Sequence, residues 1–358
     1  MFKKLKKHLE NINYEIQFKK RYKSLDLQAY KIKNEKFEGK NLNIAFLSFD
    51  RGSFTTLNII EPLKEYGNFH LFEFKTNPFD RKWYDRKNEE NERMYEFVKS
   101  LKDKLDVIVC YLSGHTAKPE VLEKIKKFEI PMINLAFDDE RKFASRKGKD
   151  GIRRGVKEIC KYFDISVTTS KSAIKKYLVE GCNPLYSYLG VNDEIYIKKN
   201  IPKKYDVSFI GANYGVRGEY IEYLRKKGIN VYTRGNGWKE GFASQEEIID
   251  IFNASKIVLG FATVGKNDDI YIIKGRDFEA PMCGSFYITS YHDELNEWYE
   301  VGKEIETYSS KEELLEKIRY YLENEKKREN IAKKGYERCT NTYTSKYFFD
   351  TLFNKVGI

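Results

Sequence analysis

Short apolar segments alternate with longer amphipathic ones along most of the chain, and this alternation restricts the fold more than any other feature. In the first half, the strand pattern occurs at residues 42–49, 69–74, 106–112, 131–137 and 163–169. Helix patterns follow at 55–66, 88–104, 119–128, 151–162 and 171–180. Uninterrupted apolar strands joined by helices are typical of a parallel sheet that is buried on both faces. The first half is therefore predicted to be a doubly wound α/β domain.

A second series of the same kind begins after a polar, lysine-rich stretch that ends at Lys204. Strands are predicted at 207–210, 229–232, 256–261 and 285–289, and helices from Arg217 and at 245–253, 275–282, 311–322 and 326–338. We expect an N-terminal domain over 1–190, a second domain over 191–342, and a C-terminal helix over 343–358 that crosses back to the first. Two Rossmann-like domains in tandem, facing a central cleft, would bind ligands at the carboxyl ends of their strands.

The net charge is concentrated at the N-terminus. Lys and Arg number 65 and Asp and Glu 54, which gives +11, and residues 1–23 contribute eight cations and two anions, or +6 of that total. Apolar residues in this segment recur at steps of three and four, so a basic amphipathic helix is predicted. It would either dock on its own domain or contact anionic lipid or nucleic acid. The remaining +5 is ordinary for a chain of this size.

Cysteine and acid spacing argue against a structural or catalytic metal. The five cysteines include no CxxC pair, and no two aspartates stand at i and i+2, as a DxD metal clamp requires. Reduced thiols, no apolar run of about 18 residues and no secretory leader predict a cytoplasmic protein without a transmembrane helix.

The segment KGRDFEAPMCG, residues 274–284, carries the most chemical information. Arg276 and Glu279 are three residues apart and share one helix face. An arginine can bind a phosphate with two hydrogen bonds, and a glutamate can accept both hydroxyls of a ribose, so the pair suits a nucleoside diphosphate. The alternative is an exposed ion pair of little consequence. Lys274 would add a third charge, unless it is already helical and faces away.

A glycine loop follows the first strand of the second domain. Gly211 opens the sequence GANYGVRG, which leads to Arg217. Such a loop lets backbone N–H groups approach phosphate oxygens at the start of a helix. It lacks the GxGxxG pattern of dinucleotide-binding domains, and a simple turn remains an alternative.

Taken together, DVSFIGA, Arg217, KGRDFEAPMCG and the charged tail resemble the donor domain of GT-B glycosyltransferases, especially the spore-maturation CgeB-like group. The resemblance implies that Glu279 binds the donor ribose. Many of these enzymes carry a further glutamate eight residues earlier, where this chain has Tyr271. A weaker resemblance, to phage DNA β-glucosyltransferase, implies an inverting reaction with an acid after the strand at 131–137 as the base. Asp139 is the better match and Asp138 the second; both could instead cap the turn.

Two loops of the first domain are further candidates. Asp50-Arg51-Gly52-Ser53 follows the first strand, where Gly52 would permit close backbone approach and Ser53 could simply cap the next helix. His115, after the strand at 106–112, is an alternative base or a satisfied polar residue.

The resemblance therefore implies a metal-independent, cofactor-free glycosyltransferase that uses a nucleotide-diphosphate sugar, with a UDP-sugar favoured. Its acceptor would be a glycan, a protein or DNA with a modified base. A nucleotide-sugar epimerase and a non-catalytic binding protein are the alternatives.

Overall fold

The computed structural model describes residues 14, 16, 41–49, 52–137, 139–263 and 271–358. The chain folds into two compact units: the first ends at Tyr188 and takes in Phe349–Ile358, and the second spans Leu189–Phe348. The basic helix expected over residues 1–23 lies outside the described residues except for Tyr14 and Ile16. Tyr14 packs against the core of the first unit, and the cations of Arg153 and Lys157 lie 5.7 and 5.8 Å from its ring centre.

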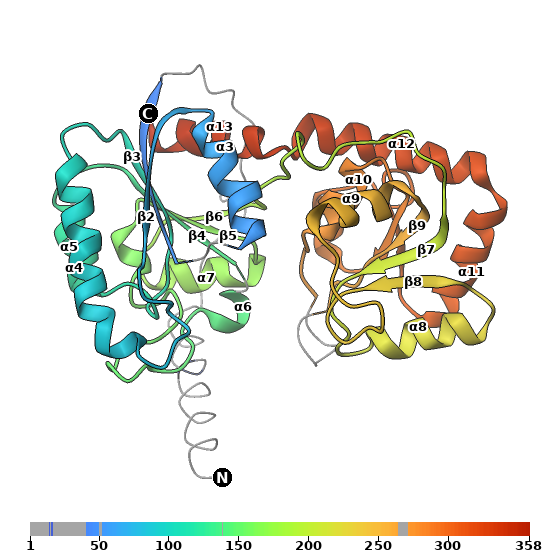
Figure 1. The fold of residues 1–358 in the computed structure, drawn as a ribbon, viewed down its shortest axis with the longest axis horizontal. Coiled ribbons are helices and arrows are strands. Elements are labelled where there is room, and N and C mark those ends of the chain that lie inside the picture. Colours follow the sequence, from blue (N-terminus) through green and yellow to red (C-terminus); the bar gives the residue numbers. More distant parts are fainter. Residues whose placement is uncertain (1–13, 15, 17–40, 50–51, 138, 264–270) are drawn as a thin grey trace, which may run out of the picture. The chain divides into compact units, whose positions relative to one another are not determined.

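The first unit is built on a six-stranded, fully parallel sheet with the order β2-β1-β3-β4-β5-β6 (Figure 1). Its strands are β1 (Leu42–Ser48), β2 (Gly67–Glu73), β3 (Val107–Tyr111), β4 (Met132–Ala136), β5 (Ile165–Thr168) and β6 (Pro184–Tyr186). The central strands are buried along nearly their whole length because helices cover both faces. The predicted parallel α/β sheet is confirmed, and β6 is a strand that the sequence did not predict.

The helices of the first unit differ from the prediction in several places. They are α2 (Ser53–Thr55), a π-helical turn (Thr56–Ile60), α3 (Glu61–Lys64), α4 (Trp83–Leu101), α5 (Pro119–Lys126), α6 (Asp139–Lys142) and α7 (Lys171–Val179). Helix α4 begins five residues before the predicted start at residue 88. The helix predicted at 151–162 is wrong: only a 3₁₀ turn, Cys160–Tyr162, forms there. Gly151 has a φ of +80°, and the backbone N–H of Gly114 donates to the Gly155 carbonyl, so this segment is a loop.

The C-terminal helix α13 (Ser345–Val356) begins in the second unit, and its residues from Phe349 onward complete the first unit. The Tyr66 hydroxyl, at the end of the α3 region, donates to Asp350 of α13 at 2.6 Å, and its ring lies 5.0 Å from that of Phe353. Helices α4, α5 and α7 share a separate apolar core around Trp83, Met94 and Tyr177.

The second unit has a five-stranded parallel sheet with the order β11-β10-β9-β7-β8. The strands are β7 (Tyr205–Ile210), β8 (Val231–Arg234), β9 (Ser255–Leu259), β10 (Tyr287–Ser290) and β11 (Glu306–Tyr308). Helices α8 (Arg217–Lys226) and α11 (Lys311–Glu323) pack on one face (Figure 1). Helices α9 (Gln245–Asn253) and α10 (Arg276–Met282) lie on the other, and α12 (Glu325–Thr342) contacts both α10 and α11. Each unit is thus a doubly wound Rossmann-like domain, as predicted.

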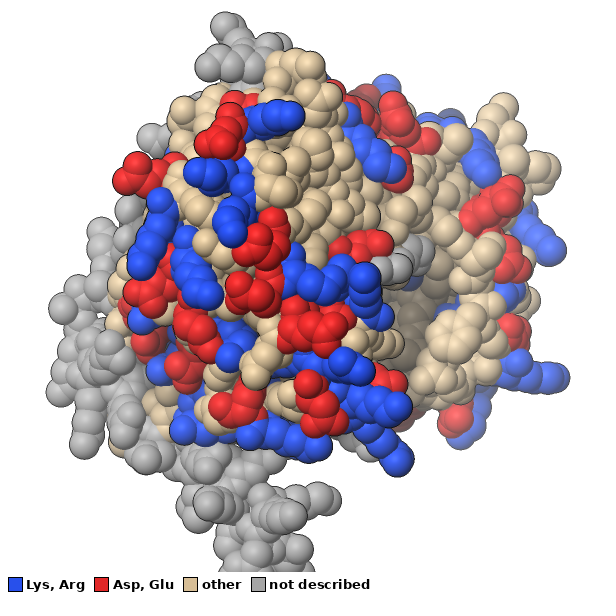
Figure 2. Space-filling model, turned by 60° about the vertical axis from the view of Figure 1, so that its left-hand side comes forward, with Lys and Arg blue, Asp and Glu red and all other residues tan. Residues whose placement is uncertain are grey.

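Charges of both signs are mixed on the surface. Figure 2 shows lysine and arginine side chains interspersed with acids over the face that it presents, without a field of one sign. Exposed pairs such as Arg86–Glu89 and Lys99–Glu96 on α4 contribute to this pattern. None of the helices in the described part of the chain is both long and apolar enough to cross a membrane.

Candidate functional site

The strand order of the second unit places a ligand-binding position at the carboxyl ends of β7 and β9. The chain leaves β7 toward β8 on one side and continues from β9 toward β10 on the other. At such a switch point the two connections diverge and leave a crevice over the strand ends. Three of the predicted site residues, Gly211, Arg217 and Arg276, meet at this crevice.

Arg217 is the first residue of α8 and is only 7% exposed. One guanidinium nitrogen, Nη1, donates to the Ala212 carbonyl at 3.0 Å, and the group lies 3.9 Å over the Tyr214 ring. Its Nε has no hydrogen-bond partner, and no carboxylate among the described residues pairs with it. Burial is the main cause that lowers the pKa of Arg217, and the nearby charge of Arg276 acts in the same direction. A buried cation without an acid is costly, and an anionic ligand would relieve that cost.

Gly211 allows this close arrangement after β7. A Cβ atom at this position would come within 2.8 Å of the Phe209 ring and 3.5 Å of Arg217 Nη1. The Gly211 carbonyl accepts a hydrogen bond from the Trp238 indole at 2.8 Å. The glycine is therefore required by packing against the Phe209 ring, and it leaves the loop backbone free of a side chain where a ligand would approach.

Arg276 reaches the same place from the opposite face of the sheet. Its Nε donates to the carbonyl of Ile210, the last residue of β7, at 3.2 Å, and its Nη1 pairs with Glu279 one helical turn later. The side chains are 27% and 6% exposed. The two residues are thus paired, as the simpler interpretation has it, but Arg276 is also anchored at the strand end beside Gly211. Glu279 is a nearly buried acceptor at the same edge.

Lys274 precedes α10, and its backbone N–H donates to Asp277 Oδ2 at 2.6 Å. Asp277 is fully buried and also accepts from the Tyr287 hydroxyl at 2.7 Å. Burial raises the pKa of Asp277 to about 6. The sequence analysis did not identify Asp277. The pattern that could have indicated it is an acid in the first turn of a helix, where the carboxylate can accept a hydrogen bond from a backbone N–H that precedes the helix. Asp277 fixes the start of α10 and therefore the positions of Arg276 and Glu279.

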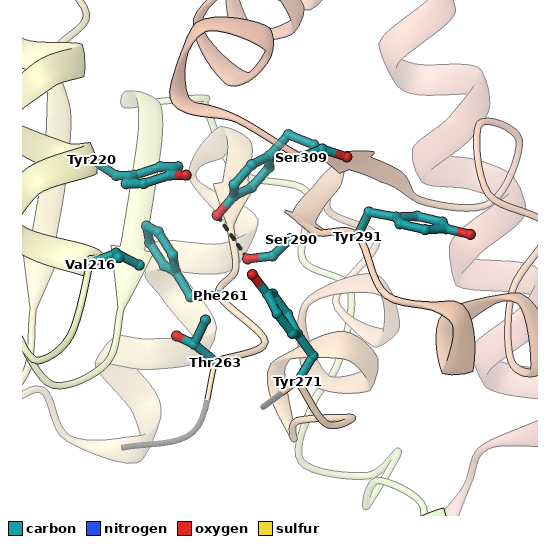
Figure 3. Close-up of a pocket in the computed structure, with 9 residues that line it drawn as sticks. Val216, Tyr220, Phe261, Thr263, Tyr271, Ser290, Tyr291 and Ser309 are labelled. Atoms are coloured by element: carbon teal, nitrogen blue, oxygen red, sulfur yellow. Dashed lines mark hydrogen bonds between the residues drawn. The ribbon is translucent and has the colours of Figure 1, made fainter. Parts of the chain in front are cut away.

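A cavity of about 270 Å³ lies beside Arg217, at the carboxyl ends of β9, β10 and β11 (Figure 3). We call it the tyrosine pocket; it is lined by Val216, Tyr220, Phe261, Thr263, Tyr271, Ser290, Tyr291, Tyr308 and Ser309. No sequence pattern indicated this pocket, because its residues come from several separate segments.

In the first unit, Asp139 is held inside the protein. It is 2% exposed; Oδ1 accepts from the Thr168 hydroxyl at 2.8 Å and Oδ2 from the Tyr177 hydroxyl at 2.7 Å. Both hydroxyls belong to the neighbouring β5–α7 segment, so Asp139 ties β4 to it. To act as a base, Asp139 would have to exchange one of these hydroxyls for an acceptor. Asp138 lies outside the described residues.

Gly52 and Ser53 follow β1 at the switch point of the first sheet, between β1 and β3. Gly52 is exposed, and its carbonyl accepts from the Thr56 backbone N–H at 3.1 Å. Ser53 is the first residue of α2 rather than the residue before it. The helix continues directly into the π-helical turn, a geometry that is frequent at functional sites.

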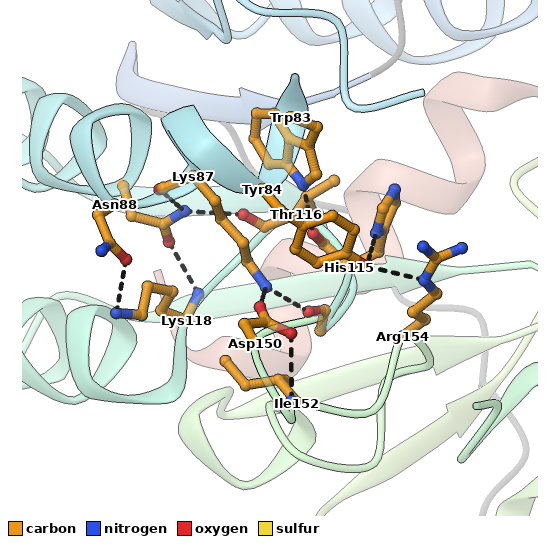
Figure 4. A network of polar contacts seen from close by, with 12 residues as sticks. Trp83, Tyr84, Lys87, Asn88, His115, Thr116, Lys118, Asp150, Ile152 and Arg154 are labelled. Carbon is orange, nitrogen blue, oxygen red and sulfur yellow. Dashed lines mark hydrogen bonds and ion pairs between the residues drawn. The ribbon is translucent and has the colours of Figure 1, made fainter. Parts of the chain in front are cut away.

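His115 stands on the other side of that switch point, in a chain of hydrogen bonds (Figure 4). Its Nε2 lies 2.8 Å from the Pro78 carbonyl, which can only accept, so Nε2 carries the proton. Burial, and then the charge of Arg154, lowers the pKa of His115, which favours the neutral ring. Nδ1 then accepts from Tyr84, whose hydroxyl in turn accepts from Arg154 Nε at 2.8 Å. Both ring nitrogens are occupied, and neither is available as a base in this arrangement.

Lys87 supports the loop that carries His115, and the sequence analysis did not identify it. It is 2% exposed, pairs with Asp150 at 2.5 Å and donates to the Gly114 carbonyl at 2.8 Å. Burial lowers the pKa of Lys87, against the effect of Asp150. A buried lysine in an amphipathic helix cannot be told from an exposed one by its spacing.

Comparison with known proteins agrees with these features. Residues 217–354 match the family model described as "Glycosyl transferase-like", so the second unit contains a glycosyltransferase-like domain. HepE (Alr3699) of Anabaena, solved with UDP and glucose, is similar with a TM-score of 0.59 at 11% identity, covering 88% of this chain and 99% of that chain. Sucrose-phosphate synthase of Thermosynechococcus elongatus gives 0.63 at 12% identity, with 88% and 99% covered.

A glycosyltransferase of Rickettsia africae gives a TM-score of 0.60 at 11% identity, with 88% of this chain and 98% of that chain covered. No curated protein sequence matches the chain. The structural matches confirm the predicted GT-B fold with its two Rossmann-like domains. Among the described residues there is no group of three or more His, Cys, Asp or Glu side chains that could hold a metal ion.

Proposed function

We propose that the protein transfers a sugar from a nucleotide-diphosphate sugar to an acceptor hydroxyl. The observation that carries this proposal is Arg217, a buried cation without a carboxylate partner among the described residues, at the strand ends where Gly211 and Arg276 also lie. The glycosyl transferase-like match of residues 217–354 begins at this arginine. A structural neighbour, HepE, has been solved with UDP-glucose, which favours a UDP-sugar as the donor.

Each residue has a role in this proposal. Arg217 binds the diphosphate and stabilises the negative charge that grows on it as the glycosidic bond breaks. Arg276 adds the guanidinium N–H groups that are not bonded to Ile210 or Glu279. Lys274, which precedes α10, adds a further positive charge. Glu279 accepts the ribose hydroxyls. Because these cations supply the charge that the leaving group needs, we propose that the reaction requires neither metal nor cofactor.

An inverting course with Asp139 as the base is the further part of the proposal. The base must take the proton of the acceptor hydroxyl as that oxygen attacks the anomeric carbon. Asp139 follows β4 at the carboxyl edge of the first sheet. For Asp139 to act, the hydroxyl of Thr168 or of Tyr177 would have to give up its hydrogen bond to the carboxylate. The anomeric configuration of the product, read by NMR, tests the course directly.

The donor site is tested with two changes of similar side-chain size and one control. Arg217→Met and Glu279→Gln should each weaken donor binding at least tenfold in isothermal titration, since a hydrogen bond to a charged group contributes about 1.5–3 kcal/mol. Arg319→Met, at an exposed arginine on α11, should leave binding unchanged. Wild-type affinity in both site variants would refute the proposal.

Product analysis separates the alternatives. Release of the nucleoside diphosphate that depends on an acceptor supports a transferase, with glycans, proteins and DNA as the acceptors to be compared. A changed sugar without nucleotide release would indicate an epimerase. Binding without any turnover would indicate a non-catalytic protein.

A further inference from the structure

We propose that Cys160 and Cys182 form a reversible disulfide that keeps Asp139 enclosed. All five cysteines of the chain are free and buried, and these two belong to the same core of the first unit. Cys160 begins the 3₁₀ turn before β5, and Cys182 lies in the loop between α7 and β6. The formation of this bond is independent of the proposed function, whereas its expected effect on turnover rests on that function.

The two cysteines are brought together by the parallel pairing of β5 with β6 (Figure 1). The backbone N–H of Ser166 donates to the Asn183 carbonyl at 2.9 Å, and the Asn183 side-chain amide donates to the Asp164 carbonyl at 3.2 Å. On the other side, Lys157 and Glu180 form an ion pair at 3.7 Å. Each cysteine therefore lies between contacts that join the same two segments of the chain.

Each thiol donates to a backbone carbonyl of its own turn. Cys160 Sγ lies 3.3 Å from the Lys157 oxygen, and Cys182 Sγ lies 3.7 Å from the Glu180 oxygen. These carbonyls belong to the two ion-paired residues, so both sulfur atoms lie beside the same bridge. The side chains also contact each other: a hydrogen bond with Cys182 is the largest cause that raises the pKa of Cys160. Disulfide geometry is specific, so thiols that already lie this close are the candidates for such a bond.

The disulfide would close a loop that contains both partners of Asp139. Thr168 and Tyr177, whose hydroxyls bond its two carboxylate oxygens, lie between the two cysteines in the sequence. Burial raises the pKa of Tyr177 most, Asp139 acts in the same direction, and both thiols add to the effect, so they lie near this ring. A covalent bond across the loop restricts the conformations in which it can open. Since Asp139 must exchange one hydroxyl for an acceptor in order to act, oxidation is expected to slow turnover.

Hydrogen peroxide would supply the oxidising power. Cys182 is 8% exposed and stands between the exposed residues Gly181 and Asn183, whereas Cys160 is fully buried. The Cys182 sulfur attacks one peroxide oxygen, the O–O bond breaks, and a sulfenic acid and one water form. The Cys160 sulfur then attacks the Cys182 sulfur, the S–O bond breaks, and a second water leaves with the Cys160 proton. The peroxide thus takes up the two electrons and two protons that the thiols lose, and a dithiol reductant reverses the change.

Peptide mapping of the full-length protein tests the bond itself. Trypsin cleaves after Lys161 and Lys176, so the peptides 158–161 and 177–198 stay together only if a disulfide joins them. The protein is treated with hydrogen peroxide, the remaining thiols are alkylated, and the digest is analysed by mass spectrometry without reduction. We expect the joined pair of peptides in the wild type and its separation by dithiothreitol.

Three variants serve as controls. Cys160→Ser and Cys182→Ser each keep a hydroxyl that can donate to the same backbone carbonyl, and neither should form the joined pair. Cys110→Ala, at a buried cysteine of β3 in the same unit, should form it as the wild type does. Thermal unfolding of the reduced proteins checks that all three are folded.

The effect on Asp139 is measured on the same samples. The oxidised wild type should have a Tm several degrees above that of the reduced protein. Release of UDP from UDP-glucose should slow on the order of tenfold on oxidation, while the affinity for UDP, measured by calorimetry, stays the same because the second unit binds it. Dithiothreitol should restore the wild type, and the two serine variants should show neither change.

The outcomes separate this inference from the proposed function. If both thiols are still alkylated after peroxide, or if either is joined to another cysteine, the inference is overturned whatever the protein binds. If the bond forms but leaves the Tm and the turnover of an active enzyme unchanged, it does not keep Asp139 enclosed and the inference is overturned as well. If the bond forms and raises the Tm, but UDP-glucose, GDP-glucose and ADP-glucose all fail to bind, the proposed function fails while the disulfide is supported.

Discussion

Replacing Tyr177 with phenylalanine tests whether Asp139 is a structural anchor. The change removes one hydroxyl, which donates to Asp139 Oδ2 at 2.7 Å, and keeps a ring that is fully buried and meets Phe143 edge-on at 4.8 Å. Packing is therefore preserved, and the change in the free energy of unfolding reports the hydrogen bond. The other oxygen stays with Thr168.

A hydrogen bond to a charged group contributes about 1.5–3 kcal/mol to stability. With an m-value of about 2 kcal/mol/M in urea, the midpoint of unfolding should fall by about 0.8–1.5 M. Tryptophan fluorescence follows the transition, since Trp83 lies in the same core. Tyr162→Phe, at a half-buried tyrosine of the same unit, is the control and should change stability by less than about 0.5 kcal/mol.

An unchanged midpoint in Tyr177→Phe would refute the reasoning, because the carboxylate would then not depend on this hydroxyl. Asp139→Asn completes the test. If it unfolds like the wild type but loses turnover by about 10²–10⁴-fold, Asp139 is a base that is free to move. If it loses stability first, the residue is an anchor and the base lies elsewhere.

Buried groups elsewhere in the chain make three further results testable. Burial lowers the pKa of His292 to about 4, so between pH 6.5 and 4 the unfolded chain binds more protons at this residue than the folded chain does. Stability therefore decreases as the pH falls through that window. The pKa of the buried Asp277 is raised, and its effect on stability has the opposite sign. The free energy of unfolding of His292→Asn, measured in urea, should therefore fall by about 2.5 kcal/mol less than that of the wild type between pH 7 and 4.5. Identical pH profiles of the two proteins would contradict the assignment of this pH dependence to His292. Gly260→Ala should cost about 1–3 kcal/mol and lower the Tm by several degrees, because its Cβ would lie 1.9 Å from the Tyr287 hydroxyl; an unchanged Tm would show that Tyr287 moves aside freely. Tyr66→Phe should release α13 to limited proteolysis, since it loses the 2.6 Å bond to Asp350, and cleavage at the wild-type rate would argue that the apolar contacts suffice.

Local patterns in the sequence were enough to predict most of the sheet. Continuous apolar runs located β1, β3, β4 and β9, since a strand buried on both faces has few polar positions. The sequence did not reveal β6 and β11, which are three residues long and therefore too short to show a period. The helix predicted at 151–162 failed because backbone contacts of Gly155 with a distant loop outweigh helical propensity.

The candidate site, like the fold, has features that the sequence predicts and features that it does not. Spacing placed Arg276 and Glu279 on one helix face, because helical geometry is local. Whether an arginine has an acid beside it is decided by other segments, so the isolation of Arg217 was not predictable. The enclosure of Asp139 by Thr168 and Tyr177, 29 and 38 residues away, was hidden for the same reason.

The first unit takes its last helix from the far end of the polypeptide. Phe349, Leu352 and Phe353 are fully buried there, although some 160 residues separate them from Tyr188, where the unit's continuous part ends. During synthesis the N-terminal part of the first unit therefore leaves the ribosome without one of its helices, until residues 349–358 have been translated. A fragment cut at residue 188 would expose the apolar surface that α13 covers, so expression of this half alone calls for a circular permutation that supplies the missing helix.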